Sequence, residues 1–173
     1  MSDELTPKIV LFDGVCVLCN YWAQFIIKQD TQKKIKLASV QSPLGQQILT
    51  YYGMSTITFD TLVYIEGLEL EELQTRHMGT EDLGFGGSSG ASLGDERKGK
   101  NNNQAFIKTA AIFKILSQLG LPWRLLTIFK IIPASLSDRA YILIARNRYK
   151  LFGKNENCIL PTPDHQSRYL SEK

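Results

Sequence analysis

The segment KIVLFDGVCVLCNYWAQFIIK, residues 8–28, joins an apolar run, a tight turn and the start of an amphipathic pattern. The apolar run ends at Asp13-Gly14, which indicates a buried strand closed by a turn. From Cys16 onward the apolar side chains recur at helical spacing, at Leu18, Trp22, Phe25 and Ile26. The pattern therefore predicts a strand followed directly by a helix over residues 16–28.

Strand and helix patterns continue to alternate beyond this segment. Residues 35–40 and 58–65 are rich in apolar and β-branched side chains, which favours strands. Ser42-Pro43 indicates the start of a helix to about residue 52, because serine is a preferred N-cap and proline fits the first turn. This order of elements predicts an α/β sheet that includes parallel pairing.

Residues 77–103 interrupt the alternation. They hold seven of the 13 glycines and an asparagine triplet, and they lack the apolar periodicity that would offset the entropy cost of ordering. We expect a flexible surface insertion here. Helical patterns return over residues 109–119, 122–132 and 135–152, with glycine or proline at their ends. The chain is thus expected to form one domain, residues 1–173, with a helical extension at 122–153.

Length and composition exclude several classes of protein. The chain has 173 residues, of which 43% are hydrophobic and 21% charged, as is usual for a globular domain with a sizeable core. No apolar run approaches the roughly 18 residues that a membrane span requires. The first ten residues, MSDELTPKIV, contain no apolar signal core. Together with the three cysteines, this leads us to expect a cytoplasmic protein.

The net charge of +3 is too small to indicate a nucleic-acid partner, and we expect none. The charge is unevenly distributed, because seven basic residues and one acid, Asp138, lie between Arg124 and Lys154. A basic surface of this kind can contact phosphate, anionic lipid or an acidic partner. A solvated helix surface is the simpler interpretation, and peripheral contact with a membrane has no further support in the sequence.

Cys16 and Cys19 form a C-x-x-C pair at the predicted helix start, where their sulfurs can close a disulfide across one turn. The first cysteine faces the free backbone N–H groups and the positive end of the helix dipole, which stabilise a thiolate. We therefore expect Cys16 to be the nucleophile in thiol–disulfide exchange and Cys19 to be the resolving thiol. Asp13 can accept or relay their proton, or it can cap the helix or stabilise the Asp-Gly turn.

The segment LFDGVCVLCNYWAQFIIKQD, residues 11–30, resembles the DCC family of thiol-disulfide oxidoreductases, which is named for one aspartate and two cysteines. Those residues fall on Asp13, Cys16 and Cys19. Further similarity lies in LASVQSPLGQQIL (37–49), KTAAIFKILSQLG (108–120), ARNRYKLFGK (145–154) and CILPTP (158–163). The resemblance implies a thioredoxin-like mixed sheet with a helical C-terminal extension. It also implies reduction of protein disulfides, and we expect no bound cofactor.

The resemblance leads to two local expectations. It places a fourth strand at residues 104–108 after an expanded hairpin loop, with a local hairpin strand over residues 68–75 as the alternative. Thioredoxins carry a cis-proline before the third strand, where this chain has Asp60-Thr61, and a trans bond is expected because a non-proline cis bond costs about 3 kcal/mol. Asp60 either brings a second carboxylate near the thiols or merely begins the strand.

Two other functions remain as alternatives. Cys16, Cys19, Cys158 and His165 are of the residue types that bind structural zinc, but their spacing is unusual and we expect no metal. The second alternative is a thioredoxin-like binding module that uses its basic helical face, in which both thiols would have ordinary reactivity. An enzyme would require a disulfide-containing protein or small-molecule substrate and an electron donor that the sequence does not identify.

Overall fold

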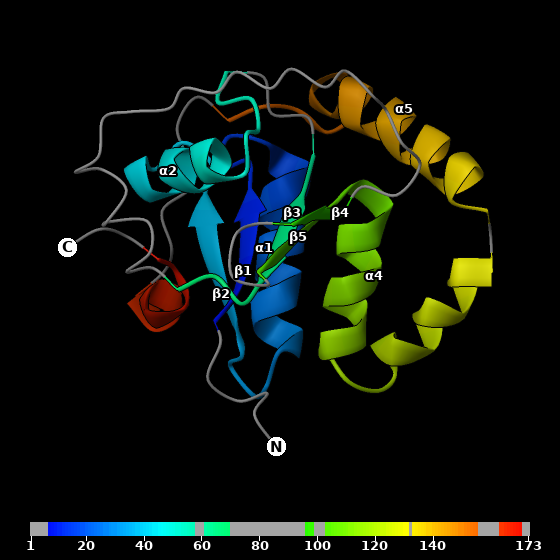
Figure 1. Ribbon diagram of the computed structural model, residues 1–173, viewed down its shortest axis with the longest axis horizontal. Helices are drawn as coiled ribbons and strands as arrows, with labels where there is room; N and C mark the ends of the chain where they lie inside the picture. The colour runs from blue at the N-terminus through cyan, green and yellow to red at the C-terminus, as the bar shows by residue number, and fades with distance from the viewer. Residues whose placement is uncertain are drawn as a thin grey trace.

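The computed structural model describes residues 7–57, 61–69, 96–98, 103–131, 133–155 and 163–170. None of the helices in these ranges is long and apolar enough to cross a membrane. The elements, in chain order, are β1 (Lys8–Phe12), α1 (Val17–Gln29), β2 (Ile35–Ser39), α2 (Pro43–Tyr51), β3 (Val63–Glu66), β4 (Glu96–Lys98), β5 (Gln104–Ile107), α4 (Lys108–Gln118), the 3-10 helix η3 (Trp123–Ile131), α5 (Ala134–Phe152) and the 3-10 helix η4 (Pro163–Arg168) (Figure 1).

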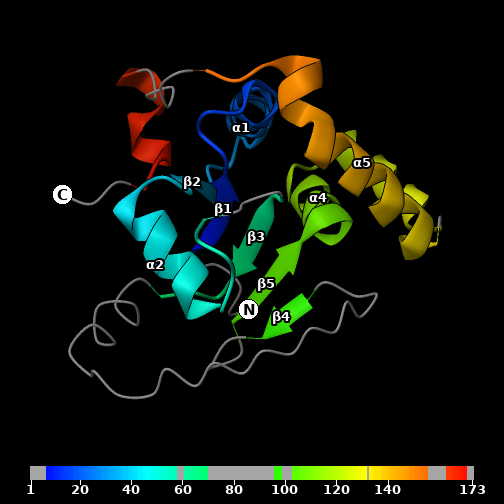
Figure 2. The same ribbon diagram turned by 90° about the horizontal axis from the view of Figure 1, so that it is seen from above.

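The strands form a mixed sheet in the order β2-β1-β3-β5-β4. β1 pairs with β2 in parallel, as the helical connection through α1 requires, and it pairs with β3 antiparallel. β3 and β5 are also antiparallel, and β4 adds an antiparallel edge strand to β5. This sheet and the helices on its two faces confirm the predicted thioredoxin-like α/β fold (Figure 2).

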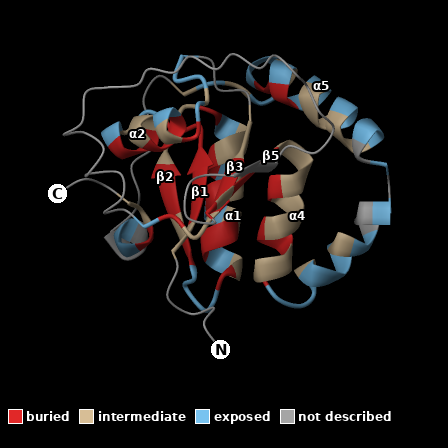
Figure 3. Cartoon of the chain, in the orientation of Figure 1, coloured by how far each residue is buried: buried red, intermediate tan, exposed pale blue. Residues whose placement is uncertain are grey.

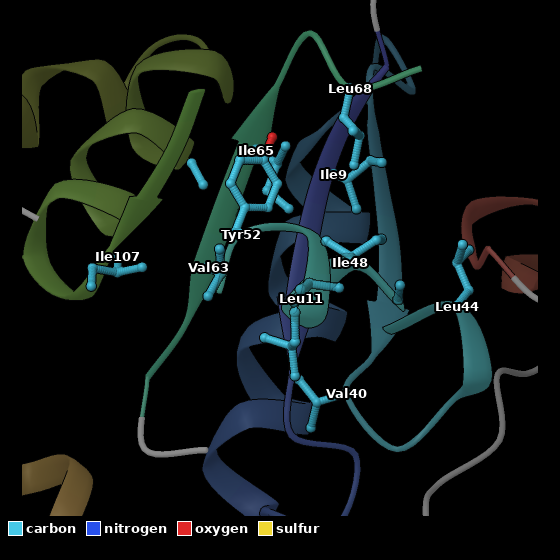
Figure 4. Packing of buried hydrophobic residues seen from close by; sticks show 13 residues of the cluster. Ile9, Leu11, Val40, Leu44, Ile48, Tyr52, Val63, Ile65, Leu68 and Ile107 are labelled. Atoms are coloured by element: carbon cyan, nitrogen blue, oxygen red, sulfur yellow. The ribbon is translucent and has the colours of Figure 1, made fainter. Parts of the chain in front are cut away.

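Two hydrophobic layers cover the sheet, because successive side chains of a strand point to opposite faces. Ile9 and Leu11 of β1 pack on the face covered by α2, with Leu44, Ile48, Leu49, Val63 and Ile65 (Figure 4). Val10 and Phe12 pack on the other face, against Ala23, Ile26 and Ile27 of α1 and Ala111, Ile115 and Leu116 of α4. The core therefore fixes β1 and α1, and the cysteine pair lies where the chain passes from one to the other.

Three segments differ from the sequence predictions. Residues 122–132 were expected to form an ordinary helix, but Trp123–Ile131 form the 3-10 helix η3, which lies between Pro122 and Pro133. The third strand, predicted over residues 58–65, is observed as β3 from Val63 to Glu66. Residues 58–60 lie outside the described ranges, and the N–H of Leu62 donates to the hydroxyl of Tyr141 at 2.8 Å instead of to a neighbouring strand. β4 falls within the predicted insertion, whose remaining residues lie almost entirely outside the described ranges.

The expected fourth strand is present as β5, Gln104–Ile107. Of the alternative hairpin strand over residues 68–75, only residues 68 and 69 are described, and these are not in a strand. Asp60, and with it the Asp60-Thr61 bond, lies outside the described residues. The helix predicted over residues 135–152 is confirmed as α5.

Candidate active site

The cysteine pair lies where β1 turns into α1. Cys16 is the N-cap residue of α1, with extended backbone angles, and its Sγ accepts a hydrogen bond from the N–H of Cys19 at 3.3 Å. Cys16 is buried and Cys19 is half-buried, and both are free thiols. A sulfur therefore occupies the position at which a serine or aspartate oxygen commonly caps a helix.

The two sulfurs differ in charge because of this geometry. The thiol of Cys19 donates a hydrogen bond to Cys16, and this bond lowers the pKa of Cys16 more than burial raises it. The N–H of Cys19 and the charge of Arg148 lower it further, and the resulting pKa of Cys16 is about 6. The same hydrogen bond, together with burial and the neighbouring sulfur, raises the pKa of Cys19 well above its usual range. At neutral pH, Cys16 is therefore a thiolate and Cys19 a neutral thiol.

Asp13 lies beneath the turn that precedes Cys16 and is 2% exposed. One carboxylate oxygen accepts from the N–H of Val15 at 3.1 Å and from Nε2 of Gln41 at 2.8 Å. The other accepts from the Arg148 guanidinium at 2.9 Å and from the Tyr149 hydroxyl. Burial raises the pKa of Asp13, but these hydrogen bonds together outweigh it and hold the pKa below its ordinary value. Asp13 is thus an ionised carboxylate that stabilises the turn and pairs with a buried cation.

Arg148 and Tyr149 come from the C-terminal half of α5, which passes close to the start of α1 (Figure 2). Arg148 is 4% exposed, and its guanidinium also donates to the carbonyl of Ala145 at 3.2 Å and to the hydroxyl of Tyr149 at 2.9 Å. Burial and the hydrogen bond to Asp13 raise the pKa of Tyr149 to about 12, so its hydroxyl stays protonated. The site therefore holds a permanent positive charge that acts on the Cys16 sulfur, and a neutral hydroxyl bonded to that cation and to Asp13.

Sequence reasoning missed these two residues. It counted Arg148 among the basic residues of an exposed helix surface, which is wrong for this residue because its side chain is buried against Asp13. The available signal was its spacing, since Tyr141, Ala145 and Arg148 follow one another at intervals of four and three residues and so share one side of a helix.

Several hydrogen bonds stabilise the backbone of the turn before α1. Asn20, also buried, donates from Nδ2 to the carbonyls of Gly14 at 2.7 Å and Cys16 at 2.9 Å. The oxygen of Gln41 accepts from the N–H of Gly14 at 2.9 Å. The chain after α5 also contacts the turn, because the N–H of Asn155 donates to the carbonyl of Val15 at 2.8 Å. The thiol pair thus lies in a backbone whose polar groups are fixed by distant parts of the chain.

The remaining candidate residues are only partly described. Cys158 lies outside the described ranges, and the side chain of His165 is also outside them, so the four-ligand zinc set is not tested. Among the described residues, no group of three or more His, Cys, Asp or Glu side chains is placed to hold a metal ion.

Comparison with known proteins identifies the family of this chain. The family model DCC1-like thiol-disulfide oxidoreductase matches residues 10–78 and 68–154. The uncharacterized protein YuxK of Bacillus subtilis is 34% identical over 169 residues, which cover 98% of each chain. A chloroplastic DCC family protein of Arabidopsis thaliana is 27% identical over 159 residues, covering 91% of this chain and 72% of its own. No solved structure matches. The chain belongs to the DCC1-like thiol-disulfide oxidoreductase family.

Proposed function

We propose that this protein reduces the disulfides of proteins or small molecules through the dithiol of Cys16 and Cys19. The observation that carries the proposal is the asymmetry between the two sulfurs. The Cys16 sulfur accepts hydrogen bonds at the start of α1, whereas the Cys19 thiol donates one. A thiolate attacks a disulfide far faster than a thiol does, so Cys16 acts first.

The reaction has two exchange steps. The Cys16 thiolate attacks one sulfur of the substrate disulfide, so that a Cys16–substrate disulfide forms and the second substrate sulfur leaves as a thiolate. Cys19 then loses its proton and attacks the Cys16 sulfur, which releases the remaining substrate sulfur as a thiolate. The Cys16–Cys19 disulfide keeps the two oxidised sulfurs, while the substrate gains two electrons and takes two protons from Cys19 and the solvent. A thiol reductant must then reduce the enzyme disulfide.

Asp13 has an indirect part in this scheme. Its depressed pKa makes it a weak proton acceptor, but its charge raises the pKa of Cys19, and its hydrogen bonds hold Arg148 and Tyr149 in the site. Asp13 therefore tunes proton transfer at the dithiol through the charges that it positions. The small, odd number of cysteines supports a reducing compartment such as the cytoplasm.

The test is single-turnover reduction of a model protein disulfide by the pre-reduced enzyme. Cys16→Ser should abolish the reaction, because no other described thiol has a lowered pKa. Cys19→Ser should still attack but accumulate a mixed disulfide on Cys16, which mass spectrometry detects. Cys158→Ser serves as the matched control and should react like the wild type. Full activity in Cys16→Ser would refute the proposal.

A further inference from the structure

The outward side of α5 carries a stripe of exposed aliphatic residues. Leu136, Leu143, Ile144 and Leu151 are 61%, 66%, 47% and 65% exposed. Leu143 and Ile144 are neighbours, and each lies seven or eight residues, about two turns, from Leu136 and Leu151. The four side chains therefore form a broad stripe along one side of the helix. We call these four residues the α5 stripe.

Exposed basic residues run beside the α5 stripe. Arg139, Arg146 and Lys150 are separated by seven and four residues, so they too share one side of the helix, and all three are exposed. We call them the basic flank. The acidic residue of α5, Asp138, is two residues from Leu136 and so projects from nearly the opposite side of the helix. The outward side of α5 is therefore apolar along its middle and positively charged along one margin.

The 3-10 helix η3 extends this surface. Leu125, Ile128 and Ile131 are 65%, 71% and 87% exposed, and their spacing of three residues places them on one side of a helix with three residues per turn. Arg124 beside them is exposed as well. Figure 3 shows the exposed residues of α5 and η3 on the sides turned away from the sheet.

The domain core does not use these side chains. α5 meets the rest of the fold through its opposite side, where the hydroxyl of Tyr141 accepts from the N–H of Leu62 and Arg148 donates to Asp13. Aliphatic residues gathered on an exposed surface weaken solubility without adding to the core, and such patches commonly mark interaction sites. The stripe and flank therefore require an explanation other than folding.

We propose that the outward surface of α5, continued by η3, docks on an anionic lipid membrane. An interfacial helix combines an aliphatic side that enters the lipid boundary with basic residues that meet anionic headgroups, which is the pattern of the stripe and flank. A second copy of the chain fits less well, since its basic flank would face another of the same charge. The four residues of the stripe are also aliphatic, whereas protein interfaces favour Tyr, Trp and Phe, and the exposed aromatic residues of α5, Tyr149 and Phe152, lie only at its C-terminal end.

The experiment is co-sedimentation of the full chain with vesicles of phosphatidylcholine, with and without phosphatidylserine. The wild type should sediment with the anionic vesicles, remain in solution with the neutral ones, and dissociate as salt is raised. The double variant Leu136→Gln/Leu143→Gln should bind the anionic vesicles at least about tenfold more weakly, because it loses the inserted aliphatic side chains. Arg139→Gln/Arg146→Gln should also lose about tenfold, through charge.

Matched control variants remove similar groups elsewhere. Ile57 is 93% exposed and distant in sequence from α5, and Lys28 of α1 and Lys34 of the loop before β2 are also exposed. Ile57→Gln and Lys28→Gln/Lys34→Gln should bind vesicles like the wild type. Equal weakening in these controls would mean nonspecific adhesion and overturn the proposal, as would a wild type that stays in solution with anionic vesicles.

Two further measurements distinguish the other outcomes. The alkylation rate of Cys16 should be the same in all variants, so that a loss of vesicle binding cannot result from misfolding. Analytical ultracentrifugation identifies a second copy as the occupant if the wild type dimerises and Leu136→Gln/Leu143→Gln does not. Such dimerisation without vesicle binding would overturn membrane docking.

Discussion

Arg146 and Arg148 are separated by one residue on α5 and lie in opposite environments. Arg146 is exposed among the basic residues of the outward side. Arg148 is 4% exposed and forms an ion pair with Asp13 at 2.9 Å beside the cysteine turn. One helix thus supplies charge to a buried site and to an exposed surface. The comparison shows that the side of the helix on which an arginine lies, rather than the residue type, decides whether it is buried in an ion pair or exposed to solvent.

The largest expected effect is the loss of stability when Arg148, but not Arg146, is replaced. Arg148→Met leaves the buried Asp13 carboxylate without its cation and should lower the free energy of unfolding by about 3–5 kcal/mol. Arg146→Met should change it by no more than about 0.5 kcal/mol, because the side chain is exposed. Urea unfolding measures both. The double variant Asp13→Asn/Arg148→Met should recover part of the loss; equal losses in the two single variants would contradict the comparison.

The same contrast applies to the apolar residues Leu143 and Ala145. Ala145 is 9% exposed and packs toward the fold, so Ala145→Leu should destabilise the protein by about 1–3 kcal/mol through overpacking. Leu143 is 66% exposed, and Leu143→Gln should lie within about 0.5 kcal/mol of the wild type. Thermal unfolding followed by circular dichroism tests the pair. A large loss in Leu143→Gln would place that residue in the core.

A smaller effect is expected on the titration of Cys16. Because its pKa is lowered to about 6, the thiolate forms and the alkylation rate rises as the pH increases through about 6. Arg148→Met removes a positive charge that favours the thiolate, so the midpoint should move to higher pH. Arg148→Lys should restore much of the wild-type profile, and Arg146→Met should leave it unchanged. Identical profiles for Arg148→Met and the wild type would exclude Arg148 as a control on the thiol.

The smallest expected effect is on how the free energy of unfolding depends on pH in acid. The pKa of Asp13 is below its ordinary value because the hydrogen bonds from Tyr149, Arg148 and Gln41 outweigh burial. The ionised carboxylate therefore contributes stability that is complete above about pH 4, the unfolded value, and is lost as the pH falls through the folded pKa. Asp13→Asn should lack this part of the acid dependence. Urea unfolding at a series of acidic pH values checks it, and parallel curves for variant and wild type would contradict it.

Local pattern was enough to predict much of the molecule. The apolar run before Asp13-Gly14 and the helical spacing after Cys16 predicted β1, α1 and the place of both cysteines between them, and all are observed. These elements are predictable because strand and helix periodicity depend on neighbours one to four residues apart. The family resemblance added the strand that became β5.

Only the tertiary structure decided which distant groups surround the thiols. Arg148 is 135 residues from Asp13 in the chain, and Tyr141 meets Leu62 across 79 residues. No local pattern predicts such contacts, because they depend on how α5 packs against the sheet and on which of its sides turns inward. The sequence by itself determined that this protein has a C-x-x-C pair of cysteines at a helix start. The packing of α5 decided which basic residue is buried with the pair and which residues remain exposed, because burial is a property of the assembled fold.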